Sequence, residues 1–383
     1  MKIIDIQTYF VQGSNDHWIW VSVKTDTGIE GWGEVTGSSN DTVLAQYIQT
    51  ITKELIDKDP LNISDCMQKY EQPSFPENGS NRFVCTAWSG INQALWDIKS
   101  QYFGLPLYWL LGGYGEKKIP LYANLNRGLL GDRSPEALLR NGLEAFENGF
   151  AVIKCTPFDE VTPIESVEKI ENGIARIKKL ASKVPMNRIA IDCHQRLNRG
   201  HMARLLEALE EIGDPYWIED PFTLEKVVEQ ESVYRDYPRI RWAAGETSYG
   251  IQDVLAISNN RQYDVIMPDV KHCGGVSAVK MMIPLIESLG LKVSLHNPSG
   301  PIATAFSAHL LTLASHPEPL EFPIGSVPER SEFLTSKEPI INGAYQLSDK
   351  PGIGIKPNYA KLAECSYTWG DGGWKKMSKE VVK

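Results

Sequence analysis

The sequence lacks three features that would each point to a particular class of protein. Its six cysteines are scattered without any CxxC spacing, which excludes a zinc knuckle or a disulfide framework and favours reduced thiols. No apolar run reaches the roughly 18 residues needed to span a bilayer. The first nine residues alternate like a strand and do not resemble a signal peptide. We therefore expect a cytoplasmic protein that does not associate with membranes.

Basic residues are also fewer than acidic ones. The chain has 39 Lys and Arg against 48 Asp and Glu, giving a formal net charge of −9, which disfavours nucleic acid as a partner. An anionic small molecule is not excluded, because a bound cation can reverse the local field. Hydrophobic residues make up 42% and charged residues 23%, as in an ordinary soluble globular protein.

The length of 383 residues suits a barrel of about 250 residues with an appendage. Residues 18–34 look like two strands joined by a turn, and helical patterns follow at residues 41–55 and 83–101. Strands followed by helices indicate an α+β lid, and a Gly-rich connection at residues 110–116 marks its end. The expected organisation is a capping domain at 1–117, a catalytic barrel at 118–350 and a segment at 351–383 that packs back on the cap.

Six acidic or imidazole residues recur at near-constant intervals of 27, 27, 23, 27 and 25 residues: Asp192, Glu219, Glu246, Asp269, His296 and Glu321. Each follows a short apolar run that reads as a strand buried on both faces. Helical patterns such as residues 203–212 and 276–289 lie between them. With strands expected at residues 119–124 and 151–154, the pattern predicts eight parallel strands. A residue that returns once per βα unit then reaches the same C-terminal rim of a barrel.

Three of these residues predict a metal site. Asp192, Glu219 and Glu246 are carboxylates on consecutive strands, and without a cation they would repel one another by several kcal/mol in a partly buried site. Oxygen ligands without Cys or paired His favour Mg²⁺ over zinc and leave positions for substrate. The alternative, three unrelated surface ion pairs, does not account for the regular spacing.

Two histidines are candidate acid–base groups. Asp269 and His296 lie on neighbouring strands, where the carboxylate can hydrogen-bond one ring nitrogen and raise the basicity of the other, so His296 is the expected general base. His194 and Arg196 would share a strand face with Asp192. His194 is then a second acid or base, and Arg196 is either a structural ion pair or a substrate contact.

Other strand-end residues complete the predicted site. Lys154, at the end of the second barrel strand, could bind a carboxylate oxygen beside the metal. Glu321 could donate a hydrogen bond if protonated or hold another group if charged. Asn124 and Thr156 are candidate substrate contacts. For Lys271 and His272, which flank Asp269, we expect loop or supporting roles.

These residues resemble the mandelate-racemase subgroup of the enolase superfamily. The resemblance covers nearly the whole chain and includes, in order, Ala94-Leu-Trp-Asp-Ile-Lys99, Asp192-Cys-His, Ile218-Glu-Asp-Pro221, Gly245-Glu246, Pro268-Asp-Val-Lys-His-Cys-Gly-Gly275 and His296-Asn-Pro-Ser-Gly-Pro301. It implies a modified (β/α)₇β barrel with an N-terminal cap, in which loops at residues 13–20 and 72–82 shape substrate choice. It also implies Mg²⁺-assisted removal of the proton α to a carboxylate, and an oligomer with an even number of subunits.

Two departures narrow the resemblance. Asp269 stands where lactonising and dipeptide-epimerising relatives carry a lysine, and Lys154-Cys-Thr156 stands where the racemase carries Lys-x-Lys. What remains resembles galactonate dehydratases more than mannonate dehydratases. This implies that His296 takes the C2 proton and His194 protonates the departing 3-hydroxyl, yielding a 2-keto-3-deoxy acid from a sugar acid such as galactonate.

Two other functions stay open on the sequence alone. An epimerase or cycloisomerase could use the same two histidines on opposite faces of an enolate. A non-catalytic sugar-acid-binding protein could keep the fold, although it would have no need for the full set of ligands and both histidines.

Overall fold

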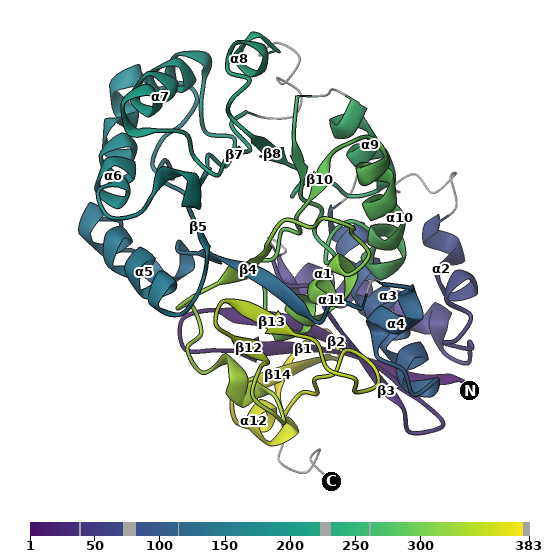
Figure 1. Ribbon diagram of the computed structural model, residues 1–383. Coiled ribbons are helices and arrows are strands. Elements are labelled where there is room, and N and C mark those ends of the chain that lie inside the picture. The colour runs from purple at the N-terminus through teal and green to yellow at the C-terminus, as the bar shows by residue number, and fades with distance from the viewer. Residues whose placement is uncertain (38–39, 72–81, 114, 223–230, 260–261, 378–383) are drawn as a thin grey trace.

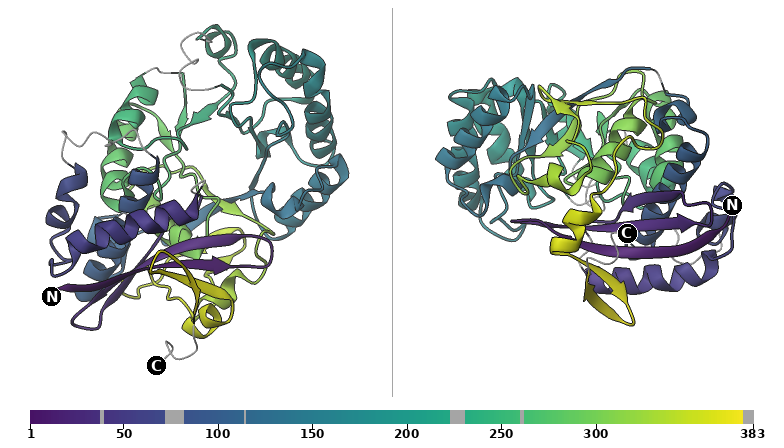
Figure 2. Two further views of the ribbon diagram at one scale, coloured as in Figure 1. Left: turned by 180° about the vertical axis from the view of Figure 1, so that it is seen from behind. Right: turned by 90° about the horizontal axis from the view of Figure 1, so that it is seen from below.

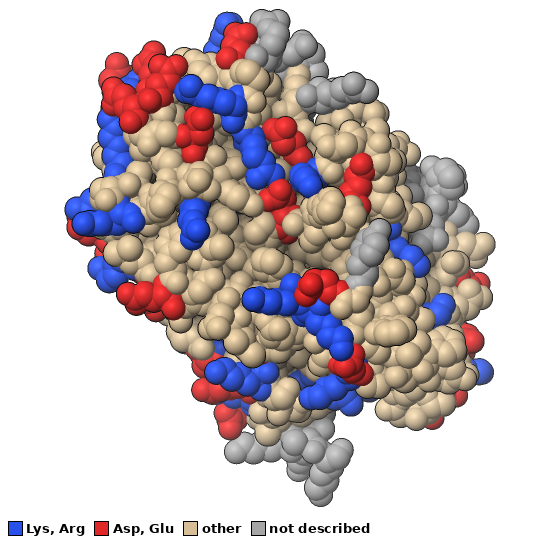
Figure 3. Space-filling model, viewed as in Figure 1, with Lys and Arg blue, Asp and Glu red and all other residues tan. Residues whose placement is uncertain are grey.

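The computed structural model describes residues 1–37, 40–71, 82–113, 115–222, 231–259 and 262–377. It consists of a parallel barrel ringed by helices and an antiparallel sheet with its own helices on one side of that barrel (Figure 1). None of the helices in these ranges is long and apolar enough to cross a membrane. Acidic and basic side chains are interspersed on the face in Figure 3.

The first part begins with three antiparallel strands. The strands are β1 (Ile3–Gln12), β2 (His17–Thr25) and β3 (Glu30–Glu34). Four helices follow: α1 (Asp41–Leu55), α2 (Ile63–Glu71), α3 (Arg82–Tyr102) and α4 (Leu107–Leu111). Helix α3 packs directly on β3 because two strand residues lack a side chain. A Cβ built on Gly31 or Gly33 would lie 2.1 Å from the carbonyl oxygen of Ala94 or Gly90, respectively.

Within the described residues, eight parallel strands form the barrel: β4 (Lys118–Asn124), β5 (Val152–Cys155), β6 (Ile189–Asp192), β7 (Trp217–Glu219), β8 (Trp242–Ala244), β9 (Val265–Ile266), β10 (Lys292–Val293) and β11 (Leu320–Pro323). Strand β11 pairs with β4, and the N–H of Glu318, just before β11, donates to the carbonyl of Val293 on β10 at 2.8 Å, which brings the two ends of the strand order together. The intervening helices are α5 (Pro135–Glu147), α6 (Glu171–Ala181), α7 (Arg199–Ile212), α8 (Glu231–Asp236), α9 (Ile251–Asn259), α10 (Gly275–Ser288) and α11 (Pro301–Leu311). The predicted (β/α)₇β class is confirmed.

A small apolar cluster fills the barrel interior and explains which side chains point inward above it. Its members are Tyr122, Val152, Ala190, Trp217, Ala243, Val265 and Met267. Side chains two residues apart on a strand share a face. Asn124, Lys154, Asp192 and Glu219 each lie two residues after a member of this cluster, so all four face the barrel axis at its C-terminal rim.

The C-terminal segment contacts both parts. Strands β12 (Ile340–Ile341) and β13 (Ala344–Gln346) extend the barrel sheet beside β4, whereas β14 (Ser366–Gly370) and β15 (Gly373–Lys376) extend the N-terminal sheet beside β1 (Figure 2). Helix α12 (Tyr359–Cys365) was not expected from the sequence. It starts where the side chain of Asn358 accepts a hydrogen bond from the N–H of Lys361. The proposed boundaries after residues 117 and 350 stay predictions.

Two buried carboxylates tie the parts together. Glu34, at the end of β3, accepts hydrogen bonds from the N–H groups of Gly300 at 2.7 Å and Ala303 at 3.0 Å, at the start of α11. Asp97 on α3 accepts from the N–H of Ile353 at 3.1 Å. The cap is therefore anchored both to the loop after His296 and to the C-terminal segment.

Candidate active site

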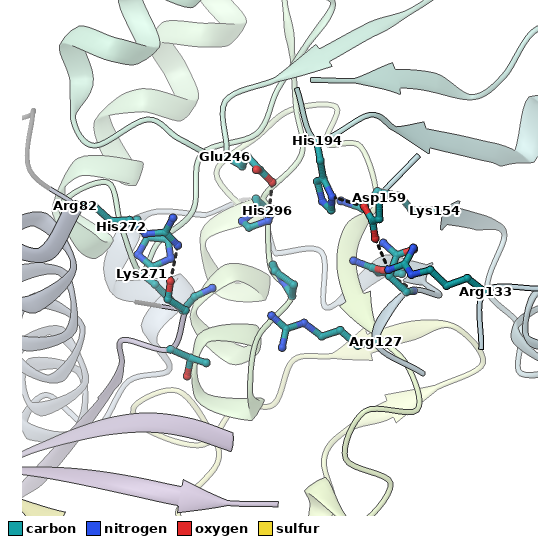
Figure 4. Close-up of a pocket in the computed structure, with 15 residues that line it drawn as sticks. Arg82, Arg127, Arg133, Lys154, Asp159, His194, Glu246, Lys271, His272 and His296 are labelled. Carbon is teal, nitrogen blue, oxygen red and sulfur yellow. Dashed lines mark hydrogen bonds and ion pairs between the residues drawn. The ribbon is translucent and has the colours of Figure 1, made fainter. Parts of the chain in front are cut away.

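A cavity of about 320 Å³ opens at the C-terminal ends of the barrel strands. The N-terminal part contributes Thr36, Gly37 and Arg82 to its wall. The barrel contributes Asn124, Asn126, Arg127, Arg133, Lys154, Asp159, His194, Glu246, Lys271, His272, His296 and Pro298 (Figure 4). Most of the lining residues are thus polar, and the basic side chains among them outnumber the acidic ones. A small anionic molecule fits such a cavity better than an apolar one.

The three predicted metal ligands are placed by different local structures. Asp192 and Glu219 end β6 and β7 and are paired across these strands. Glu246 lies two residues past β8, after Gly245, whose φ of 127° is in the region that favours glycine. Asp192 and Glu219 are each only 1% exposed. The strands after β7 are shorter than their apolar runs, so Glu246, Asp269 and His296 stand on loops beyond the strand ends.

Lys154 lies at the centre of the buried acids. Its Nζ is 3.2 Å from Asp192 Oδ2, 2.9 Å from Glu219 Oε1 and 2.9 Å from Glu321 Oε1. Burial lowers the pKa of Lys154, but the three carboxylates outweigh this and raise it well above its usual range. Burial, opposed by Lys154, raises the pKa of Glu219 to about 8. The lysine thus supplies part of the positive charge that this cluster requires.

The donor set fits a hard divalent cation in its chemistry. Asp192 Oδ2 is buried without a hydrogen-bond partner, although two cationic nitrogens lie 3.2 Å away. Within the described ranges, no three Asp, Glu, His or Cys side chains are already grouped as metal ligands. Glu246 is turned towards His296, with its Oε2 3.0 Å from the ring Nε2. Three carboxylates on consecutive strands are nonetheless the oxygen ligands that Mg²⁺ favours.

His296 and Asp269 form a dyad. Asp269 Oδ2 lies 2.8 Å from His296 Nδ1 and also accepts a hydrogen bond from Lys271 Nζ at 2.8 Å. Burial lowers the pKa of His296, but Glu246, Glu321 and the Asp269 hydrogen bond raise it to about 10. In this arrangement the ring is therefore protonated at neutral pH: Nδ1 donates to Asp269, and Nε2 lies 3.0 Å from Glu246 Oε2. His296 can act as a base only after Nε2 loses this proton, and departure of the Glu246 carboxylate would favour that loss.

His194 reaches the cavity by a route other than the one its spacing suggested. Strand β6 ends at Asp192, and His194 and Gln195 have φ values of 46° and 58°, so residues 192, 194 and 196 do not share a strand face. A turn brings His194 back to its neighbour instead: its N–H donates to Asp192 Oδ1 at 3.0 Å, and Nε2 lies 3.2 Å from Oδ2. The charge of Asp192 raises the pKa of His194 to about 11, so the ring is protonated at neutral pH.

The same turn directs Arg196 elsewhere. Its Nη1 donates to the carbonyl of Val161 at 3.2 Å. Arg196 is not one of the described residues that line the cavity. Thr156 also stands outside this wall, with its hydroxyl donating to Asp159 Oδ2 at 3.2 Å. Both side chains thus bind protein groups in this structure, and their roles as substrate contacts stay predictions.

Glu321 on β11 and Asn124 on the adjacent strand β4 are hydrogen-bonded to each other, and Asn124 lines the cavity. Glu321 accepts from Asn124 Nδ2 at 2.6 Å and from the N–H of Asn297 at 2.8 Å. Burial raises the pKa of Glu321, but Lys154 and His296 lower it to about 2. Of the two roles considered for Glu321, the structure favours the charged one, which holds other groups in place.

Sequence reasoning missed several cavity residues. Asp159 bridges the site, with Oδ1 3.1 Å from His194 Nδ1 and Oδ2 paired with Arg133. Arg127 and Arg133 follow β4. All three lie outside the strands, so no strand periodicity marks them. Of the two loops expected to shape substrate choice, residues 13–20 contribute Asp16, which pairs with Arg127. The other, residues 72–82, contributes Arg82 to the cavity wall, and its residues 72–81 are outside the described residues.

Comparisons with known proteins agree with this architecture. Residues 4–112 match the mandelate racemase / muconate lactonizing enzyme N-terminal domain, and residues 138–361 match the enolase C-terminal domain-like family. D-galactonate dehydratase from Variovorax paradoxus is 26% identical over 100% of both chains. D-galactonate dehydratase from Pectobacterium atrosepticum is 28% identical over 96% of this chain and 94% of its own.

A solved member of the enolase superfamily from Salmonella Typhimurium has a TM-score of 0.84 at 25% identity, covering 97% of this chain and 100% of its own. A mandelate racemase/muconate lactonizing enzyme from Jannaschia sp. CCS1 has a TM-score of 0.85 at 22% identity, covering 97% and 99%. Since the barrel family model alone spans more than half of the chain, the protein belongs to the mandelate racemase/muconate lactonizing enzyme family of the enolase superfamily.

Proposed function

We propose that the protein is a lyase that dehydrates a sugar acid to a 2-keto-3-deoxy acid. The observation that carries this proposal is the pair of histidines in one cavity with different partners. His296 is oriented through Nδ1 by Asp269 at 2.8 Å, and His194 is held protonated beside Asp192. His296 can accept a proton once Glu246 moves away and Nε2 has lost its own proton, whereas His194, which lies between two carboxylates, is set up to donate one. The names of the D-galactonate dehydratase relatives favour the same reaction class.

In the proposed reaction, the substrate carboxylate lies near Asp192, Glu219 and Glu246. Mg²⁺ held by these three side chains would supply the positive charge that stabilises the enolate form of the substrate carboxylate. Lys154 adds a fixed cation to the same region, where an ammonium at hydrogen-bond distance is most effective in a water-poor site.

The proton transfers follow from the two histidines. Nε2 of His296, once released from Glu246 and deprotonated, removes the proton from C2, and the electron pair of that C–H bond enters the enolate. The C3–O bond then breaks while His194 gives its ring proton to the departing hydroxyl, which leaves as water. The resulting enol takes up a proton at C3 and loses the proton of its C2 hydroxyl, which gives the keto acid. Asp159 and Asp192 hold the His194 ring throughout.

A product assay tests the proposal. Purified enzyme with Mg²⁺ is incubated with a stereochemically complete set of aldonic and aldaric acids, and keto acids are trapped with semicarbazide. The proposal expects a keto-deoxy product from at least one acid. Deuterium uptake at C2 without loss of the hydroxyl would assign the enolate to an epimerase or cycloisomerase. Absence of both product and exchange across the set would contradict the proposed reaction.

A further inference from the structure

Arg127 faces the cavity from the side opposite the proposed metal end. In the ring of eight strands, β4 stands across from β8, and Arg127 follows β4 as Glu246 follows β8. The Arg127 side chain extends into the cavity in Figure 4 and is 38% exposed. A substrate with its reacting carboxylate near Asp192, Glu219 and Glu246 would therefore direct its far end towards β4.

Half of the Arg127 guanidinium is open for a ligand. Nη1 pairs with Asp16 of the capping part. Among the described residues, neither Nε nor Nη2 of Arg127 has a hydrogen-bond partner. These two nitrogens form one edge of the planar group, and such an edge matches the two oxygens of a carboxylate. The Asp16 contact thus fixes the orientation of the group without closing this edge.

The backbone that carries Arg127 is rigidly held. The side chain of Asn126 accepts a hydrogen bond from the N–H of Thr156 at 2.8 Å, and its own N–H donates to Asn124 Oδ1 at 3.0 Å. Gly128 packs so closely on the segment after β11 that a Cβ there would lie 2.6 Å from the carbonyl oxygen of Ile324. The backbone thus fixes where the Arg127 side chain starts and the Asp16 pair holds its end, so the guanidinium loses less freedom on binding than an unrestrained one would.

The surrounding charge favours an anion at this end. Arg133 also lines the cavity and pairs with Asp159, so the acid nearest to it is already neutralised. The two acids of the wall, Asp159 and Glu246, are thus both engaged with other groups. A neutral hydroxymethyl group would use at most one N–H of the open Arg127 edge, whereas a carboxylate would use both.

We propose that Arg127 binds a second carboxylate, so that the preferred substrate is a sugar diacid, an aldarate, and not the monoacid named in the galactonate dehydratase relatives. This inference rests on the proposed function and names the substrate class of the same site. Because charge-assisted two-point contacts are among the strongest hydrogen bonds in proteins, Arg127 would determine specificity at the end of the substrate away from C2.

Matched pairs of six-carbon acids test the inference. Each hexarate is compared with the hexonate of the same configuration, using the full-length enzyme with Mg²⁺ and its R127Q and R140Q variants. Arg140 is an exposed arginine on α5, so R140Q removes the same charge away from the cavity. We expect the wild type to favour a hexarate by about 10-fold or more in kcat/KM. R127Q should lower kcat/KM by about 10- to 100-fold for the hexarate and by less than about 3-fold for the hexonate. R140Q should change kcat/KM for neither acid.

The other outcomes separate the two proposals. Turnover of a hexonate in preference to every hexarate, or equal losses on both acids in R127Q, would overturn the diacid inference and leave the dehydratase intact. If no acid is dehydrated, the proposed function fails, and calorimetric titration of hexarates into wild type and R127Q decides the subsite. About 10-fold weaker binding to R127Q supports it, and equal or absent binding overturns it.

Discussion

The contact between Glu34 and helix α11 should be a major source of stability between the two parts of the molecule. Glu34 is fully buried, and its two oxygens accept three hydrogen bonds: from the N–H groups of Gly300 at 2.7 Å and Ala303 at 3.0 Å, and from the hydroxyl of Thr36 at 2.8 Å. Towards these three groups Glu34 acts only as an acceptor. The substitution Glu34→Gln keeps the shape but replaces one acceptor oxygen with an NH₂ donor.

The cost of E34Q follows from these contacts. At least one N–H at the start of α11 would face the new NH₂ group, and a buried unsatisfied donor costs about 1–3 kcal/mol. Loss of the negative charge at the helix N-terminus adds about 1 kcal/mol. Burial raises the pKa of Glu34, which shows that a neutral side chain recovers part of this cost. The expected loss in the free energy of unfolding is therefore about 2 kcal/mol, within a range of about 1–4 kcal/mol.

Urea unfolding followed by tryptophan fluorescence measures this loss, with Glu210→Gln as the matched control on the exposed face of α7. The urea midpoint of E34Q should fall, whereas the free energy of unfolding of the control should stay within about 0.5 kcal/mol of that of the wild type. Because Gly300 closes the loop after His296, kcat in the product assay should fall as well. An E34Q protein as stable as the control would refute the reasoning that this carboxylate holds the cap to the barrel.

Three further predictions concern other parts of the molecule. Burial raises the pKa of Asp97 to about 7, so its pKa in the folded protein lies above that in the unfolded chain. The free energy of unfolding should therefore fall as pH rises from about 4 to 7, by up to about 4 kcal/mol. This pH-dependent component should vanish in D97N when unfolding is measured across that range. A flat wild-type profile would contradict it. Gly33→Ala should destabilise the folded protein by more than about 3 kcal/mol because its Cβ would meet the Gly90 carbonyl. Gly370→Ala, which has open space around it, should change the free energy of unfolding little in the same assay. Equal effects of the two substitutions would show that the α3–β3 packing is not critical. Asp192→Asn should weaken Mg²⁺ binding measured by calorimetry, and unchanged affinity would remove Asp192 from the proposed ligand set.

The parts of the fold that repeat along the chain were predictable. The positions of Asp192 and Glu219 at the rim could be predicted because each ends a buried strand, and the interior residues two positions earlier, Ala190 and Trp217, fix the direction of their side chains. The spacing could not show where each strand stops. It placed Glu246 at a strand end, whereas Gly245 turns the chain after β8 and carries Glu246 onto a loop.

The remaining site residues depend on turns and on contacts between domains. The position of His194 next to Asp192 comes from two residues with positive φ, a conformation that strand periodicity does not anticipate, and this is why Arg196 was wrongly placed on the same face. Arg127 acquires its orientation from Asp16 in the other domain. Such pairs join residues far apart in the sequence, and only the three-dimensional arrangement brings them together.

Proton exchange at C2 tests the central claim most directly, because it separates the roles of the two histidines. An acid that the wild-type enzyme dehydrates is incubated in deuterated water with the His194→Asn, His296→Asn or wild-type enzyme, and the reaction is followed by NMR. The account predicts that His194→Asn exchanges the C2 proton but forms little keto acid, and that His296→Asn does neither. Wild-type exchange and turnover in His296→Asn would contradict the account, because the base that it assigns would then be dispensable.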